Sequence, residues 1–212
     1  MQAEVEPTTP STLDDVRFAV IDVETSGLSA RRHRILQIAV VTARADGTIV
    51  DRWSSYVRPR WRWFARLGPR HIHGISRRHL RSAPPVDEVM AQLGPRLVGT
   101  GTVVAAHNLA FDWGFLRQTA LRCGGQLSGG PRLCTLELSR SLPAARIDEA
   151  PGSVERPFVS HRLVDLCDRY GVTLTNAHDA LADAEATAAL LPHLLAEAGI
   201  TTVEQLLQRA ER

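Results

Sequence analysis

RFAVIDVETSGL, residues 17–28, is the segment on which the predicted fold of this chain rests. Its first seven residues are mostly apolar and rich in β-branched side chains, which predicts a buried strand. Asp22 and Glu24 stand two residues apart at the end of that strand, so both carboxylates point to one face. The Thr25-Ser26-Gly27 that follows allows a sharp turn and offers backbone N–H groups to an anion. Alone, such a pair of acids also fits a solvated strand end.

The segments around this strand predict one α/β domain with a mixed sheet. Asp46-Gly47 is a hairpin turn signal, so the chain opens with three antiparallel strands, and helix–strand units follow them. The expected strands are 17–23, 34–43, 48–57, 102–106 and 132–135, and the expected helices are 85–97, 110–122, 135–142, 164–170 and 180–198, with a short helix near His71. Thr201 with Glu204 predicts the capping box of a last helix. We expect this single domain over residues 16–212, after a disordered tail over 1–15.

The composition is that of a globular domain. The chain has 212 residues, of which 44% are hydrophobic and 23% charged, which excludes a disordered chain and a disulfide miniprotein. No stretch reaches the roughly 18 uninterrupted apolar residues of a membrane span, and the acidic N-terminus does not look like a signal peptide. The three cysteines lack CxxC spacing, which favours reduced thiols. We therefore expect a cytoplasmic protein with no membrane partner.

The charge is unevenly placed along the chain. The net charge is only +2, yet residues 52–86 contain nine arginines and no acid, which points to a polyanionic partner. Within the Arg/Trp-rich segment 52–81, Trp61 and Trp63 alternate with arginines, a pattern that suits single-stranded nucleic acid. Packing of these tryptophans onto the domain, with the arginines solvated, explains the segment equally well. Residues 143–158 form a long Pro- and Gly-rich loop, which we expect to shape substrate access.

Two further segments place acids at the start of helices. In HNLAFD, residues 107–112, Asn108 is a suitable N-cap and Asp112 falls in the first turns. In HDALADAEAT, residues 178–187, Asp179 suits the N-cap, and Asp183 lies one turn later among alanines. Each motif alone also fits an ordinary capped helix.

Together, the acids on three separate segments predict a cation site. Carboxylate oxygens are hard ligands, which favours Mg²⁺ or Mn²⁺ over Zn²⁺. Two such ions clamp the attacking and leaving oxygens of a phosphodiester. Histidine is a common general base, so His178 could accept a proton from the attacking water.

The segments IDVETSGL (21–28), HNLAFD (107–112) and HDALADAEAT (178–187) resemble the three motifs of the DEDDh, or DnaQ-like, 3′→5′ exonuclease family. That family includes the proofreading, epsilon-type exonuclease of bacterial DNA polymerase III. The resemblance implies a ribonuclease-H-like fold, with a mixed five-stranded sheet of three antiparallel strands and then parallel strands, flanked by helices. It implies two divalent cations on Asp22, Glu24, Asp112 and Asp183, and His178 as general base. It further implies substrate-binding roles for Thr25, Gly27, Leu28, His107, Asn108 and Phe111.

The expected function is that of a metal-dependent exonuclease. It would remove 5′-mononucleotides from the 3′ end of single-stranded or frayed DNA. A DNA polymerase is a candidate protein partner. The wording of 21–28 favours DNA, because oligoribonucleases of the family usually carry Met at the position of Thr25. Two alternatives stay open: an RNA or oligoribonucleotide exonuclease of the same family, and a non-catalytic nucleic-acid-binding or polymerase-associated adaptor.

Overall fold

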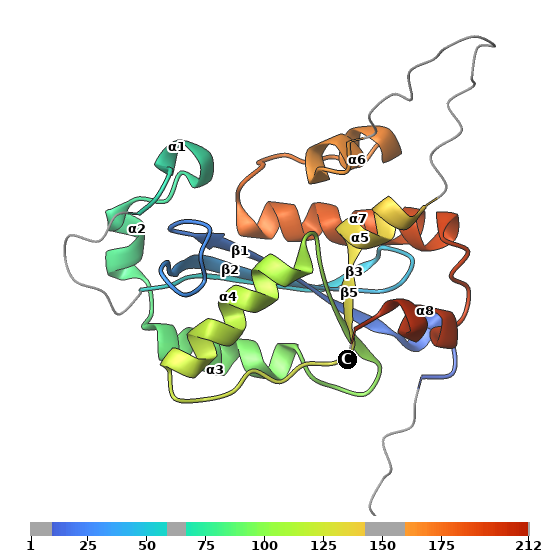
Figure 1. The fold of residues 1–212 in the computed structure, drawn as a ribbon, viewed down its shortest axis with the longest axis horizontal. Helices are drawn as coiled ribbons and strands as arrows, with labels where there is room; N and C mark the ends of the chain where they lie inside the picture. Colours follow the sequence, from blue (N-terminus) through green and yellow to red (C-terminus); the bar gives the residue numbers. More distant parts are fainter. Residues whose placement is uncertain (1–9, 59–66, 143–159, 212) are drawn as a thin grey trace, which may run out of the picture.

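Five strands form one mixed sheet in the computed structural model, which describes residues 10–58, 67–142 and 160–211 (Figure 1). The strand order is β3-β2-β1-β4-β5. The strands are β1 (Arg17–Thr25), β2 (Ile35–Ala43), β3 (Ile49–Tyr56), β4 (Thr102–Ala106) and β5 (Arg132–Cys134). β1 pairs antiparallel with β2, as does β2 with β3, whereas β4 runs parallel to both β1 and β5. The predicted fold class and sheet are therefore confirmed.

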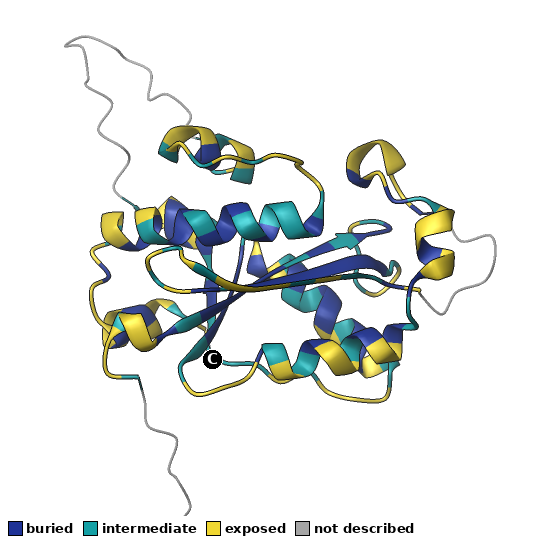
Figure 2. Ribbon diagram, turned by 180° about the vertical axis from the view of Figure 1, so that it is seen from behind, coloured by how far each residue is buried: buried dark blue, intermediate teal, exposed yellow. Residues whose placement is uncertain are grey.

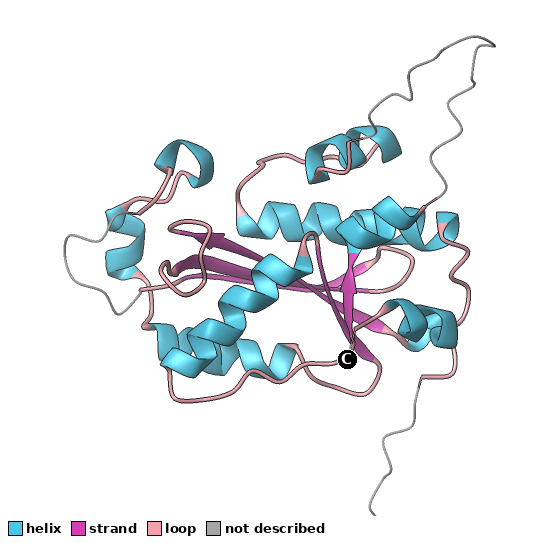
Figure 3. Cartoon of the chain, viewed as in Figure 1, coloured by secondary structure: helices cyan, strands magenta, loops and turns pink. Residues whose placement is uncertain are grey.

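Helices cover both faces of the sheet (Figures 1 and 3). They are α1 (Arg70–His73), α2 (Arg77–Ser82), α3 (Val86–Leu93), α4 (Leu109–Arg122), α5 (Thr135–Ser141), α6 (Leu163–Tyr170), α7 (Ala180–Glu197) and α8 (Val203–Arg209). Two short 3-10 helices, Leu13–Asp15 and Gly94–Arg96, complete the elements of the described residues.

The alternation of β1 separates the two cores. Phe18 and Val20 point into a core shared with α5, α6, α7 and α8, whereas Ala19 and Ile21 point into a core shared with α3 and α4. Figure 2 shows the central strands as almost continuously buried, as expected for a sheet covered on both sides. By the same alternation, Asp22 and Glu24 belong to the face that α7 covers.

Three local expectations need correction. Beyond the short helix expected near His71, residues 74–85 were expected to be irregular, but they contain a second short helix, α2. This helix begins at a capping box formed by Ser76 and His79, which was not predicted. The box before α8 uses Thr202 and Gln205, one residue beyond the expected pair, and Thr202 accepts a hydrogen bond from the Gln205 backbone N–H.

The expected N-terminal tail lies partly outside the described residues, which begin at residue 10. Its last part is helical rather than disordered, because Thr12 and Asp15 form a capping box around Leu13–Asp15. The expected loop 143–158, and the part of the Arg/Trp-rich segment over 59–66, also lie outside the described residues. No helix in the described part of the chain is long and apolar enough to cross a membrane.

Candidate active site

The site begins where β1 and β4 separate. Their parallel pairing ends at Val20 and Ala105, so the next backbone groups of β1 on that side lack a strand partner. Asp112, on the first turn of α4, fills this gap: its Oδ1 accepts a hydrogen bond of 3.1 Å from the Val23 N–H. Asp112 is only 3% exposed. This hydrogen bond satisfies a backbone N–H of β1 that has no strand partner, and it holds the Asp112 carboxylate beside the end of β1.

Asp22 and Glu24 emerge at this end of β1, and α7 begins above them. The buried alanines Ala180 and Ala184 have no bulky side chain to hold α7 away from the sheet. The first turn of α7 therefore lies over the two β1 carboxylates, and it carries Asp183. The spacing of Asp22 and Glu24 predicts that they share one face of the sheet. The packing of α7 then brings a third acid, Asp183, to that face.

Asp179 fixes the start of α7. Its Oδ1 accepts hydrogen bonds from the N–H groups of Leu181 and Ala182, at 3.1 and 3.2 Å, which confirms the predicted N-cap. Its Oδ2 accepts a 3.2 Å hydrogen bond from the side-chain amide of Gln37 on β2. Gln37 is 5% exposed and pairs with Glu24 across the sheet. No role was predicted for Gln37, because no local pattern in the sequence signals a partner so distant in the chain.

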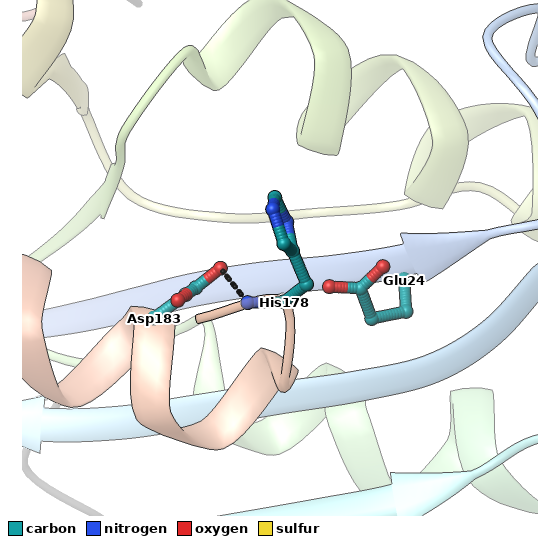
Figure 4. Close-up of side chains that lie close together, drawn as sticks. All are labelled: Glu24, His178 and Asp183. Carbon is teal, nitrogen blue, oxygen red and sulfur yellow. Dashed lines mark hydrogen bonds between the residues drawn. The ribbon is translucent and has the colours of Figure 1, made fainter. Parts of the chain in front are cut away.

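His178 directly precedes this cap. Its backbone N–H donates a 3.2 Å hydrogen bond to Asp183 Oδ2, and its side chain is exposed. The ligand atoms of Glu24, His178 and Asp183 all lie within 4.8 Å of one another. Figure 4 shows the three side chains, which come from β1 and from the start of α7.

All five predicted catalytic side chains line one pocket of about 1110 Å³. The lining also includes His107, Asn108 and Phe111 from the second motif. The opposite wall comes from α5, α6 and the residues before α6, which no sequence motif had indicated: Leu136, Arg140, Ser160, His161, Arg162, Leu163 and Asp165.

Burial, together with the charges of neighbouring acids, raises the pKa of the four acids that come from the motifs, Asp22, Glu24, Asp112 and Asp183. Burial, and then the charge of Asp112, holds the pKa of Asp22 well above its usual range. Burial likewise raises the pKa of Asp112, although the hydrogen bond from Val23 favours its ionised form. Burial is also the main cause that raises the pKa of Glu24 to about 8 and that of Asp183 to about 6.

The donor set fits hard divalent cations. It consists of carboxylate oxygens, and Asp183 Oδ1 is buried without a hydrogen-bond partner among the described residues. A buried carboxylate oxygen in that state is costly unless a cation satisfies it. A positive charge would also favour the ionised carboxylates and so offset the burial and the mutual repulsion that raise their pKa values.

The remaining residues of the first motif lie beside the pocket rather than in its lining. Thr25 is buried, and its hydroxyl donates a 2.8 Å hydrogen bond to the Gly27 carbonyl. Gly27 has φ +152°, and a Cβ there would lie 2.6 Å from the ring of His33, so only glycine fits this turn. Leu28, which follows, is 87% exposed.

The second motif is built differently from the prediction. Asn108 occupies the N-cap position of α4, but its side chain makes no capping hydrogen bond, because its backbone is left-handed at φ +74°. Asparagine tolerates that conformation better than most residues. His107 Nε2 donates a 3.0 Å hydrogen bond to the His161 carbonyl and so fixes the opposite wall. Asn108 and His178 are the two non-glycine residues with positive φ in the described chain, and both line the pocket.

The family model for RNase_T, described as an exonuclease, matches residues 19–191. The chain belongs to the RNase_T exonuclease family. The match spans β1 to most of α7 and so includes all three motifs. The resemblance drawn from these motifs is therefore confirmed at the level of the exonuclease family.

Relatives of this exonuclease domain include bacterial polymerases. The chain is 34% identical over 184 residues to a DNA polymerase III PolC-type of Bacillus cereus, covering 86% of this chain and 12% of that protein. It is 33% identical over 198 residues to a DNA polymerase III PolC-type of Bacillus subtilis, covering 92% of this chain and 13% of that protein. The chain thus spans about an eighth of the length of these curated relatives.

The exonuclease fold is also that of a solved structure. Escherichia coli exonuclease I, in complex with a dT13 oligonucleotide, superposes with a TM-score of 0.72 at 22% identity, over 86% of this chain and 41% of that one. This likeness independently confirms the ribonuclease-H-like architecture.

Proposed function

We propose that this domain is a metal-dependent 3′→5′ exonuclease of the DEDDh subtype that acts on single-stranded or frayed DNA. The observation that carries the proposal is the meeting of Asp22, Glu24, Asp112, Asp183 and His178 in one pocket of an exonuclease-family domain. A non-catalytic adaptor would have no use for four acids held together at the cost that their raised pKa values indicate.

In this proposal each side chain has a distinct task. The four acids hold two divalent cations, Mg²⁺ or Mn²⁺, which supply Lewis-acid stabilisation of the phosphodiester when bound. His178 accepts the proton of the attacking water through its exposed ring. Water then attacks the phosphorus of the 3′-terminal nucleotide, and the bond from this phosphorus to the 3′-oxygen of the preceding nucleotide breaks. That oxygen takes up a proton from solvent and stays with the shortened strand as its new 3′-hydroxyl. The product is a 5′-mononucleotide.

Residues beside the pocket would hold the terminal nucleotide. The turn over Thr25 and Gly27 and the exposed Leu28 follow directly on the catalytic strand, whereas His107, Asn108 and Phe111 line the pocket itself. A terminal nucleotide that must leave its duplex to enter such a site reacts faster when it is frayed or mismatched. DNA is preferred in the proposal because the relatives are DNA polymerases and exonuclease I was solved with a DNA strand.

Association with a DNA polymerase is part of the same proposal. It is supported by the PolC-type relatives, in which the matching segment is one part of a far longer polymerase chain.

The test is a panel of 5′-labelled oligonucleotides, DNA and RNA, single-stranded, paired and 3′-mismatched, with Mg²⁺. Stepwise shortening of single-stranded and mismatched DNA, abolished by a chelator, is the expected result. Asp22→Ala should lose at least about 10³-fold in turnover, because part of the cation clamp is gone. Internal cuts would contradict an exonuclease, a preference for RNA would contradict the DNA assignment, and full activity in chelator would contradict the cation site.

A further inference from the structure

A basic arm, residues 67–82, stands beside the pocket and is not used by the proposed chemistry. It contains α1 and α2, carries four arginines and three histidines, and has no acid. Its arginines, Arg70, Arg77, Arg78 and Arg81, are all exposed. No ion pair or hydrogen bond from their side chains is present among the described residues.

The arm is firmly anchored despite this exposed charge. Leu67, Ile75 and Leu80 are buried against Leu36 of β2. His73 is buried, and its Nε2 donates a 3.1 Å hydrogen bond to the Leu67 carbonyl while its Nδ1 accepts one of 3.0 Å from the Ile75 N–H. The apolar side of the arm thus fixes it to the sheet, and the arginines form its outer side.

The arm also touches the turn that follows the catalytic strand. A Cβ on Gly68, which has φ +80°, would lie 2.6 Å from the Ser26 carbonyl oxygen, so the two backbones are in direct contact. Ser26 follows Glu24 by two residues. Figure 1 shows α1 and α2 at this end of the sheet. The backbone of the arm is therefore held beside the end of β1, the strand that carries Asp22 and Glu24.

We infer that the outer side of the basic arm binds the phosphate backbone of the strand whose 3′ end occupies the pocket. This inference rests on the proposed function and adds a second, extended contact to it. A strand whose 3′ end lies in the pocket must cross the adjoining surface. Four exposed guanidinium groups on the arm, which make no ion pair with any of the described residues, can each pair with a phosphate. Affinity should then grow with strand length until the arm is covered.

The test removes charge from α2 while keeping side-chain size. Arg77→Gln/Arg78→Gln should raise KM for a strand of roughly fifteen nucleotides relative to KM for the p-nitrophenyl ester of thymidine 5′-monophosphate, which has no strand. Binding of a labelled strand, measured by anisotropy without divalent metal, should weaken by roughly tenfold at low salt. Its salt slope should fall by about 0.7 for each lost contact.

The matched control is Arg44→Gln/Arg117→Gln, which removes two exposed arginines outside the arm. An unchanged salt slope in the arm variant, or an equal change in the control, would overturn the inference. Because strand binding is measured without turnover, its result does not depend on the proposed function. If binding depends on the arm but neither the ester nor the strand is hydrolysed, the inference about the arm is supported and the proposed exonuclease function is rejected.

Discussion

Asp183 is the residue whose environment is most incomplete without a cation. One carboxylate oxygen accepts the His178 N–H, and the other is buried with no partner in the described chain. Replacing the carboxylate by an amide keeps the volume but removes an anionic ligand.

We therefore expect Asp183→Asn to lose at least about 10³-fold in turnover and to lose the increase in melting temperature that Mg²⁺ or Mn²⁺ gives the wild type. Thermal melts with chelator and with metal measure the second effect directly. Asp51→Asn, an exposed acid on β3, is the control and should behave like wild type. Retained stabilisation by metal in Asp183→Asn would remove this residue from the cation site.

His178 differs from the acids, because its ring is exposed and the role that we propose for it is proton transfer rather than binding. We expect His178→Ala to lower turnover by roughly 10²–10⁴-fold while strand affinity stays near wild type. Added imidazole should restore part of the lost rate, since a free base can occupy the space left by the ring. A variant that binds strands poorly and is not rescued would instead indicate a ligand or a structural residue.

At the scale of elements, the link between β2 and α7 sets the geometry of the site. Gln37 donates to one oxygen of Asp179, and the other oxygen caps α7. A carboxylate at position 37 would face Asp179 and repel it. We expect Gln37→Glu to lower kcat by roughly tenfold to a hundredfold through a small shift of α7, with KM changed much less.

The same pair offers a rescue. In Gln37→Glu/Asp179→Asn, the new amide still caps the helix and can donate to the new carboxylate, so kcat should recover most of the loss. Gln126→Glu, which adds the same charge in an exposed loop, should leave kcat unchanged. If the double variant is as slow as Gln37→Glu, the bond does not position α7.

At the scale of the whole molecule, the acids couple stability to pH and metal. Burial raises the pKa of Glu24 from 4.5 to about 8 and that of Asp183 from 3.8 to about 6. A pKa raised in the folded state means that the folded chain holds more protons than the unfolded chain between the two values. Without metal, stability therefore falls as pH rises through this window.

Bound cations favour the ionised carboxylates, so they should cancel this loss. We expect the gain in melting temperature with Mg²⁺ or Mn²⁺ to be larger at pH 8 than at pH 5.5, as measured by scanning calorimetry in chelator and in metal. Glu24→Gln/Asp183→Asn should show neither the metal gain nor its dependence on pH. A gain that is equal at both pH values would contradict the coupling.

The succession of strands and helices along the chain and the identity of the acids could be predicted from local sequence patterns. Hydrophobic runs and turn signals are local properties, so β1, the hairpin and α7 follow from them. The common face of Asp22 and Glu24 follows from strand alternation, and the cap at Asp179 from its place before an apolar stripe. These features needed no knowledge of distant residues.

Which of these residues come into contact depends on how distant segments pack together, and local patterns could not predict it. The hydrogen bond from Val23 to Asp112 joins residues 89 apart, and that from Gln37 to Asp179 joins residues 142 apart. The left-handed backbone of Asn108, the wall around His161 and the docking of the basic arm on β2 depend in the same way on packing between segments. Such contacts form because the sheet and its helices bury apolar surface against one another. A local sequence pattern does not specify which distant segment will pack against it.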